Sequence, residues 1–231
     1  MPITSEYLQA RANMVDSQLR PNRVLDPALL DAFQTVPREW FVPAKLQAAA
    51  YADEDLPLGG GRHVLAPLTI ARMLQAARIA KSDVALVVGG GTGYGAALAG
   101  KLTRTVTLLE PEAGLAGQAR TALRRVGLGN VSVIEGPAAQ GYAARSPYDV
   151  IIIEGAVAEV PPALLAQLSQ GGRLVAILQE VGETPLVAPD IAAIGQAVVM
   201  QRIGSGIETE ILFETGTPGL PGLGAQPVFS L

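Results

Sequence analysis

The chain has 231 residues, enough for one large α/β domain or two small ones; 49% are hydrophobic and 16% charged, as in a globular rather than a disordered protein. The formal net charge is −4 and there is no run of Lys or Arg, so we expect no nucleic-acid partner. The absence of cysteine excludes disulfides and thiolate ligands, and with His63 as the single histidine we expect no metal site.

Residues 1–80 are predicted to be mostly helical. The segment DPALLDAFQTV begins with Asp26, a good N-cap residue, followed by Pro27, which is favoured at the first helical position. Apolar residues recur at helical spacing over 67–79. The acidic stretch YADEDLPLGGG between these segments is predicted to form loops or short turns.

From residue 84 onward, short apolar runs alternate with segments of helical spacing. PEAGLAGQARTALRRVG and PPALLAQLSQGG are predicted helices that end at Gly. The apolar runs do not alternate with polar residues, so they predict strands buried on both faces, as in a parallel sheet covered by helices. These runs are VALVV, VTLLE, VSVIEG, DVIIIEG and GRLVAIL.

The last two apolar runs predict an antiparallel hairpin at one edge of the sheet. They read QAVVMQRIG and ETEILFETG and flank a Ser-Gly pair. Residues 216–231 are rich in Gly and Pro, and we expect an irregular tail that only Val228 and Phe229 could anchor.

No repeat or break in composition indicates a second domain. We therefore predict one domain over 1–231, with a mostly helical region (1–80), a sheet core (81–215) and the tail (216–231). The first twenty residues lack an apolar segment typical of a signal peptide, and no apolar run is long enough to span a bilayer. We therefore expect a cytoplasmic protein with no membrane partner.

The stretch VALVVGGGTGYG predicts a strand, a glycine turn and a helix that begins near Tyr94. Glycines at Gly89, Gly91 and Gly93 permit a tight turn and let backbone N–H groups approach a ligand. Glu110 ends the neighbouring strand, where a carboxylate can accept both hydroxyls of a ribose.

The glycine turn can be read in two registers. From Gly91 it matches the dinucleotide pattern G-x-G-x-x-A, with Glu110 near the place of an NAD-binding acid. From Gly89 it begins directly after the strand, as in the nucleoside turn of S-adenosylmethionine (SAM) enzymes. A tight turn without a ligand is the third interpretation, although three alternate glycines exceed what such a turn needs.

Four motifs occur in the order and at the spacing of a known family: VPREWFVP, YADEDLPLG, GGGTGY and EVPPALLAQLSQGGRLV. Over about residues 14–180 the chain thereby resembles the protein-L-isoaspartate O-methyltransferases. The resemblance implies an α/β, Rossmann-like, seven-stranded SAM-dependent methyltransferase fold with a helical N-terminal cap. It implies SAM as the cofactor, and methylation of the abnormal carboxylate of isoaspartyl residues in damaged proteins or peptides.

The resemblance also assigns residues to the cofactor site. It implies that Gly89, Gly91, Gly93 and Glu110 face SAM, and that Gly136 lies near the adenine.

Two departures from the family pattern fall at positions expected to contact SAM. Val87 stands where the family usually has an acid, two residues before the first glycine of the turn. After the third strand, Gly136-Pro137-Ala138 replaces the usual Gly-Asp-Gly. Both changes remove polar groups, and hydrogen bonds to charged groups contribute about 1.5–3 kcal/mol each.

A third departure lies in GGGRHVLAP, residues 59–67, where the family usually carries Thr-Ile-Ser and this chain has His63, Val64 and Leu65. Leu65 replaces a serine hydroxyl that lies beside the methyl group and the substrate. A carboxylate acceptor, with an ordinary pKa near 4, needs no general base. The change therefore removes an orienting contact, and it leaves recognition of isoaspartate open.

Three side chains are candidates beside the glycine turn. His63 could be a general base or orienting group for a phenol or amine acceptor, or a surface histidine. Arg62 could bind a substrate or cofactor carboxylate, or face solvent. Glu154 follows the fourth strand at the carboxyl edge, where ligands bind. Segment 59–67 is expected to be a mobile lid with glycine hinges.

The predicted function is that of a SAM-dependent O-methyltransferase acting on isoaspartyl carboxylates. Three alternatives remain open at this point. They are a methyltransferase with another acceptor, a non-catalytic SAM-binding homologue and an NAD-dependent enzyme.

Overall fold

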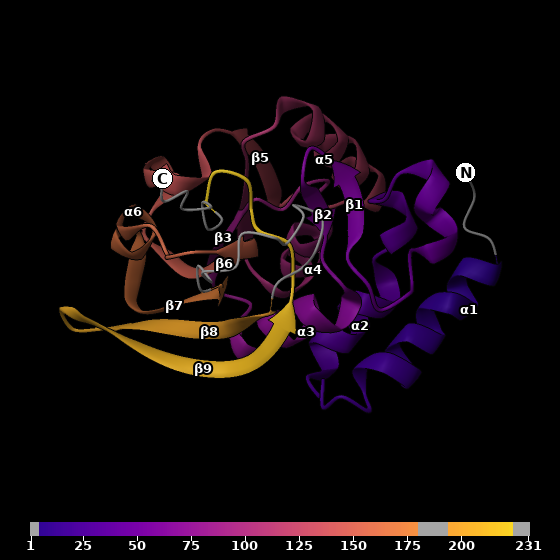
Figure 1. Ribbon diagram of the computed structural model, residues 1–231, viewed down its shortest axis with the longest axis horizontal. Coiled ribbons are helices and arrows are strands. Elements are labelled where there is room, and N and C mark those ends of the chain that lie inside the picture. Colours follow the sequence, from indigo (N-terminus) through magenta and orange to yellow (C-terminus); the bar gives the residue numbers. More distant parts are fainter. Residues whose placement is uncertain (1–4, 180–193, 224–231) are drawn as a thin grey trace, which may run out of the picture.

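The computed structural model describes residues 5–179 and 194–223 and contains a seven-stranded sheet flanked by helices (Figure 1). Strands β3 to β7 run parallel, whereas β8 pairs antiparallel with β7, and β9 with β8. The order across the sheet is β5 (Val131–Glu135), β4 (Thr105–Glu110), β3 (Val84–Val88), β6 (Tyr148–Val157), β7 (Leu168–Leu178), β8 (Ile194–Ile203) and β9 (Gly206–Gly216).

Helices account for most of the N-terminal region, which lies at one end of the molecule, while the turn of hairpin β8–β9 projects at the other (Figure 1). The α-helices are α1 (Ser5–Met14), α2 (Pro27–Thr35), α3 (Pro67–Ala76), α4 (Tyr94–Leu102), α5 (Ala113–Val126) and α6 (Pro162–Ala166). A π-helical turn (Val15–Leu19) continues α1, and 3-10 turns occur at Arg38–Trp40, Ala44–Ala49, Ala138–Gln140 and Ala143–Arg145.

The predicted strands and the terminal hairpin are confirmed. In β3 every residue after Val84 is buried, and in β6 every residue except Asp149 is buried, because helices cover both faces of the sheet. The predicted start of α2 is also confirmed: the Asp26 side chain accepts hydrogen bonds from the N–H groups of Ala28 (2.8 Å) and Leu29 (3.2 Å).

Alternate residues of each strand enter two separate cores. The larger core contains Val87 of β3 together with apolar residues of α2, α3, α4 and α5. The smaller core, on the other face, contains Leu86 and Val88 with Leu164 of α6 and Leu220 of the tail. The sheet is therefore filled from both sides, and its carboxyl edge is where a ligand could bind.

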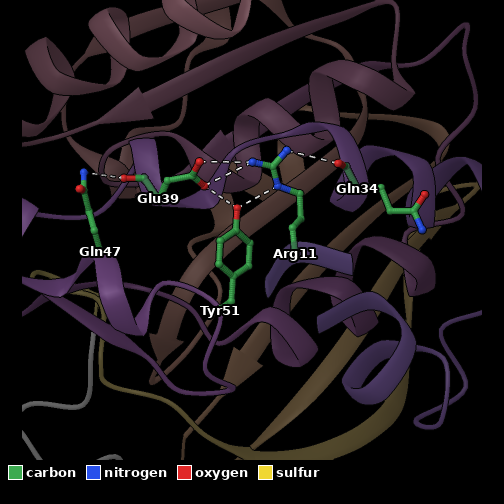
Figure 2. Close-up of polar contacts among 5 residues, drawn as sticks. All are labelled: Arg11, Gln34, Glu39, Gln47 and Tyr51. Atoms are coloured by element: carbon green, nitrogen blue, oxygen red, sulfur yellow. Dashed lines mark hydrogen bonds and ion pairs between the residues drawn. The ribbon is translucent and has the colours of Figure 1, made fainter. Parts of the chain in front are cut away.

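A buried polar cluster joins α1 to the segment that follows α2 (Figure 2). Arg11 donates to the Tyr51 hydroxyl (2.9 Å), to the Glu39 carboxylate (3.3 Å) and to the Gln34 carbonyl (3.3 Å). Tyr51 also donates to Glu39, and burial raises the pKa of the Tyr51 hydroxyl far above its ordinary range. Gln47 donates to the Glu39 carbonyl (3.1 Å), so four segments of the cap meet at one carboxylate residue.

Two predictions about secondary structure are wrong. YADEDLPLGGG is not all loop, because β1 (Leu56–Gly59) pairs antiparallel with β2 (Arg62–Val64). Leu56 and Val64, which pair across this hairpin, are both buried. Burial of these side chains favours the strand conformation, and the segments are too short for a periodic pattern to reveal it. The helix predicted over PPALLAQLSQGG ends at Ala166, because Leu168 already belongs to β7.

Part of the tail makes contacts that the sequence did not predict. Val228 and Phe229 lie outside the described residues. Within the described part, Gly219 forms a bridge with Ala156 of β6, and the Leu220 side chain is 2% exposed. Among the helices that the structure describes, none has the length and hydropathy of a membrane span.

Candidate functional site

The site lies at the carboxyl edge of β4, β3 and β6, at the centre of the sheet. The register pairs Val88 with both Leu109 and Ile153, so the residues that follow these three lie side by side. Those residues are Gly89, Glu110 and Glu154.

The glycine turn begins directly after β3, which is the register read from Gly89. Gly89, Gly91 and Gly93 all have positive φ angles, of 71°, 56° and 94°. A Cβ on Gly89 would lie 2.7 Å from Leu220, and a Cβ on Gly91 would lie 2.7 Å from Leu58 of β1. The turn therefore needs glycine both for its conformation and because hairpin β1–β2 and the tail pack directly onto it.

Glu110 is fully buried and accepts four hydrogen bonds. Arg62 binds it through both Nη atoms (2.7 and 2.9 Å), and the N–H groups of Gly91 (2.8 Å) and Glu112 (3.0 Å) complete the set. Arg62 also donates to the Gly89 carbonyl (2.5 Å) and is 5% exposed. The interpretation of Arg62 as a solvated residue is therefore wrong, because β2 brings it to the carboxylate predicted to hold a ribose.

Gly136 lies at the same edge, since its N–H donates to the Glu110 carbonyl (3.4 Å). Val87 is fully buried in the larger core, and its apolar side chain has no polar group to offer at the edge. Leu65 is 2% exposed, so the position of the family serine is filled by a core side chain.

Glu154 is buried, and its Oε1 has no hydrogen-bond partner among the described residues. The carboxylate lies against the start of α4, where a Cβ on Gly95 would be only 1.9 Å from Oε1. Burial raises the pKa of Glu154 to about 7; Arg62 and Arg38 lower it, and Glu110 adds to the rise.

His63 is half-buried on β2, so it is not a fully exposed surface histidine. Its Nδ1 is enclosed and lacks a partner within the residues described. With Arg62, Glu154 and Leu220 it lines a cavity of about 10 Å³, which is room for roughly one water. The edge is therefore closed by β2 and by the tail.

Sequence reasoning missed Leu220 and the pairing of Arg62 with Glu110. Leu220 lies in an aperiodic Gly/Pro-rich tail, and no local pattern predicts that it returns to a turn more than a hundred residues earlier. Bidentate Arg–carboxylate pairs are common in proteins, and which carboxylate a given arginine binds cannot be identified before the topology is known.

A larger cavity of about 270 Å³ lies between the acidic stretch, α3 and β9. Asp55 and Asp53 line it, but both accept backbone N–H groups at the start of α3, from Ala66 (2.6 Å) and Leu68 (3.0 Å). These carboxylates therefore act as caps. In the described segments, no three His, Cys, Asp or Glu residues are grouped so as to hold a metal.

Comparison with protein families and known sequences gives one consistent result. A family model described as protein-L-isoaspartate(D-aspartate) O-methyltransferase matches residues 10–202. A protein-L-isoaspartate O-methyltransferase of Koribacter versatilis is 44% identical, over 84% of this chain and 83% of that protein. Another, from Herpetosiphon aurantiacus, is 39% identical over 78% and 81% of the two chains.

Comparison with solved structures shows the same fold. A protein-L-isoaspartate O-methyltransferase aligns with a TM-score of 0.77 at 24% identity, over 93% of this chain and 67% of that one. A putative enzyme of this kind from Plasmodium falciparum, in complex with S-adenosyl-L-homocysteine, aligns with a TM-score of 0.71 at 17% identity, over 93% and 97% of the two chains.

Proposed function

Because the chain belongs to the protein-L-isoaspartate(D-aspartate) O-methyltransferase family, we propose that it transfers a methyl group from SAM to the carboxylate of isoaspartyl residues in damaged proteins or peptides. The observation that carries this proposal is the family match over residues 10–202. It coincides with a glycine turn and an acidic residue at the carboxyl edge of the sheet. We further propose that the enzyme is cytoplasmic, which cell fractionation tests.

The residues at the edge fit the cofactor once the edge is open. The turn from Gly89 to Gly93 supplies bare backbone, Glu110 can accept ribose hydroxyls, and Glu154 offers an unpaired oxygen. In the closed arrangement Arg62 holds Glu110, and Leu220 lies on Gly89. Cofactor binding therefore requires β2 and the tail to move away from the turn.

SAM, when bound, supplies an electrophilic methyl group on a sulfonium. The acceptor carboxylate is already ionised at neutral pH, so the chain has to position it and exclude water. Arg62 binds a carboxylate in a bidentate manner here, and we assign it the acceptor carboxylate after it leaves Glu110. Leu65 and Leu220 are buried and keep the edge dry.

The direct test is methyl transfer from labelled SAM to an isoaspartyl peptide, with the matching aspartyl peptide as control. We expect a base-labile methyl ester on the isoaspartyl peptide only. Glu110→Gln should abolish the ester, and Glu208→Gln, at an exposed position of β9, should leave it unchanged. No ester on the isoaspartyl peptide, or equal ester on both peptides, would overturn the proposal.

A second candidate is methyl transfer to another acceptor, which the buried Leu65 at the family's serine position favours. Half-buried His63 could then take a proton from a phenol or amine. His63→Ala separates the two cases. It should leave ester formation on the isoaspartyl peptide intact, whereas transfer to a protonated acceptor should be lost.

A further inference from the structure

Glu154 is a buried carboxylate with one oxygen left unpaired by the residues that the structure describes. The side chain sits in the β6 edge position next to the glycine turn, and its Oε1 lacks any partner among the described residues. Glu110, two strands away at the same edge, has four donors. A buried carboxylate without a donor costs far more than a paired one, so its retention indicates a ligand that supplies the missing donor.

The carboxylate of Glu154 lies against the glycine turn and the start of α4. A Cβ on Gly90 would be 3.5 Å from Oε1, and a Cβ on Gly95 would overlap it. Glu154 also lines the 10 Å³ cavity together with Leu65 and Gly155. It therefore stands between the glycine turn and the remaining free space at the edge.

Four charged or titratable groups face Glu154, namely Arg62, Arg38, Glu110 and His63, and none donates a hydrogen bond to Oε1. Arg62 of β2 is committed to Glu110 and to the Gly89 carbonyl. Arg38, fully buried in the turn after α2, donates to the Ala50 carbonyl and stacks on Tyr94. His63 borders the same cavity.

Both Nη atoms of Arg38 also lack partners in the described part of the chain, so one water between Arg38 and Glu154 is the structural alternative. The experiment below distinguishes a water-bridged pair from a ligand site.

The cofactor's amino-acid end brings an ammonium group, and the family's acid near the turn is absent. Val87, which replaces that acid, is fully buried and apolar. An α-ammonium at this edge would meet the partial positive charge at the start of α4, which disfavours a cation. It therefore needs a carboxylate, and among the buried carboxylates that the structure describes at this edge, Glu154 is the one with an unpaired oxygen.

We propose that Glu154 is the counter-charge for the α-ammonium of SAM in this chain, in place of the acid missing at Val87. The inference rests on the proposed function, because it assumes that SAM is the cofactor. Glu154 is a cofactor-binding residue in this account, and it takes no part in the methyl transfer itself.

Calorimetric titration of the full chain with two ligands tests the proposal. S-adenosylhomocysteine carries the amino-acid end, and 5′-methylthioadenosine has the same nucleoside without it. Glu154→Gln should weaken S-adenosylhomocysteine about 10–100-fold, as expected for loss of a charged hydrogen bond. It should change methylthioadenosine affinity less than about twofold. Glu208→Gln, which alters an exposed carboxylate of β9, should change neither.

A second readout uses the unaltered chain and does not depend on how a variant folds. A nearby ammonium lowers the pKa of Glu154 from about 7, so binding should release up to about half a proton at pH 7. Titration in buffers of different ionisation enthalpy measures this release, which should occur with S-adenosylhomocysteine and not with methylthioadenosine.

The outcomes separate the inference from the proposed function. If both ligands bind but Glu154→Gln affects neither, or weakens both equally, the counter-charge role is overturned and Glu154 is structural. Equal proton release with the two ligands overturns it as well. If neither ligand binds the unaltered chain, the proposed function fails and the inference fails with it.

Discussion

Arg62 and Glu110 lie 48 positions apart in the sequence and form a buried ion pair at the carboxyl edge of the sheet. Both are almost completely buried, so the attraction acts where water does not screen it. The local sequence predicts both the glycine turn and the place of Glu110 at the end of β4, because each is recognised from the apolar strand run that it ends or follows. The local sequence cannot predict the contacts of Arg62 with Glu110 and with the glycine turn, because these depend on where hairpin β1–β2 packs.

Replacement of Arg62 by Met should destabilise the protein strongly. The change leaves a buried carboxylate with two backbone donors and no cation, and breaking such a pair typically costs about 3–5 kcal/mol. Urea denaturation measures the free energy of unfolding. Arg20→Met, which breaks the exposed pair with Asp16, serves as control and should cost less than about 1 kcal/mol. Equal small losses for the two variants would contradict the prediction.

Glu154 should make stability depend on pH. Burial raises its pKa from 4.5 to about 7, so the folded state binds a proton more tightly than the unfolded state does. The resulting stability is fully present below about pH 4.5 and is lost as pH rises through 7, a change of about 3 kcal/mol. Glu154→Gln should remove this loss.

The measurement for Glu154 is denaturation of both forms at pH 5 and pH 8 without ligand. The difference in free energy of unfolding between the two pH values should shrink in the Gln variant. An unchanged difference would show that other groups cause the pH dependence.

At the scale of elements, hairpin β1–β2 and the tail form the cover of the site. The tail is fixed to β6 by hydrogen bonds of the Ala156 N–H to the Pro218 carbonyl (3.0 Å) and of the Leu220 N–H to the Ala156 carbonyl (2.7 Å). The sequence revealed the five parallel strands because each contains a short, mostly apolar run. It missed β1 and β2, which have four and three residues and owe their conformation to burial against the rest of the fold.

Leu220→Ala should open the cover. The variant loses side-chain atoms that contact Gly89 and the smaller core, and such truncations cost about 2–5 kcal/mol. If about 2 kcal/mol of this loss destabilises the closed arrangement relative to the open one, the open arrangement becomes more populated. S-adenosylhomocysteine should then bind up to about 30-fold more tightly. Calorimetry measures the affinity, and Leu8→Ala, at an exposed position of α1, is the control. Unchanged or weaker binding by Leu220→Ala would contradict this role of the tail.

At the scale of the whole molecule, the cap and the sheet share a core. The larger cluster runs from Met14 and Phe33 of the N-terminal region through β3 to Ala197 of β8. The apolar runs and their spacing predicted a parallel sheet covered by helices after a mostly helical N-terminal region, and the family resemblance implied the cap. The closed carboxyl edge was not predictable, because it depends on contacts between segments far apart in the sequence.

The shared core leads us to propose one domain over the whole chain, as its composition predicts. Thermal unfolding should therefore show one transition, with equal calorimetric and van't Hoff enthalpies. Fluorescence of Trp40 in the cap and far-ultraviolet circular dichroism should give coincident curves. Two transitions, or melting of the cap before the sheet, would contradict the proposal.

The ion pair between β2 and β4 has a kinetic and thermodynamic consequence for any nucleoside that binds there. The guanidinium is tethered, so dilution of the protein does not lower its effective concentration at the carboxylate. A free ligand must displace the Arg62 guanidinium from Glu110. The apparent dissociation constant of the ligand equals its intrinsic constant divided by the fraction of molecules in which Arg62 has left Glu110. Ligand binding is thus an exchange, at the Glu110 carboxylate, of the protein's own guanidinium for the ligand. The strength of the internal ion pair sets the ligand concentration at which the enzyme becomes active.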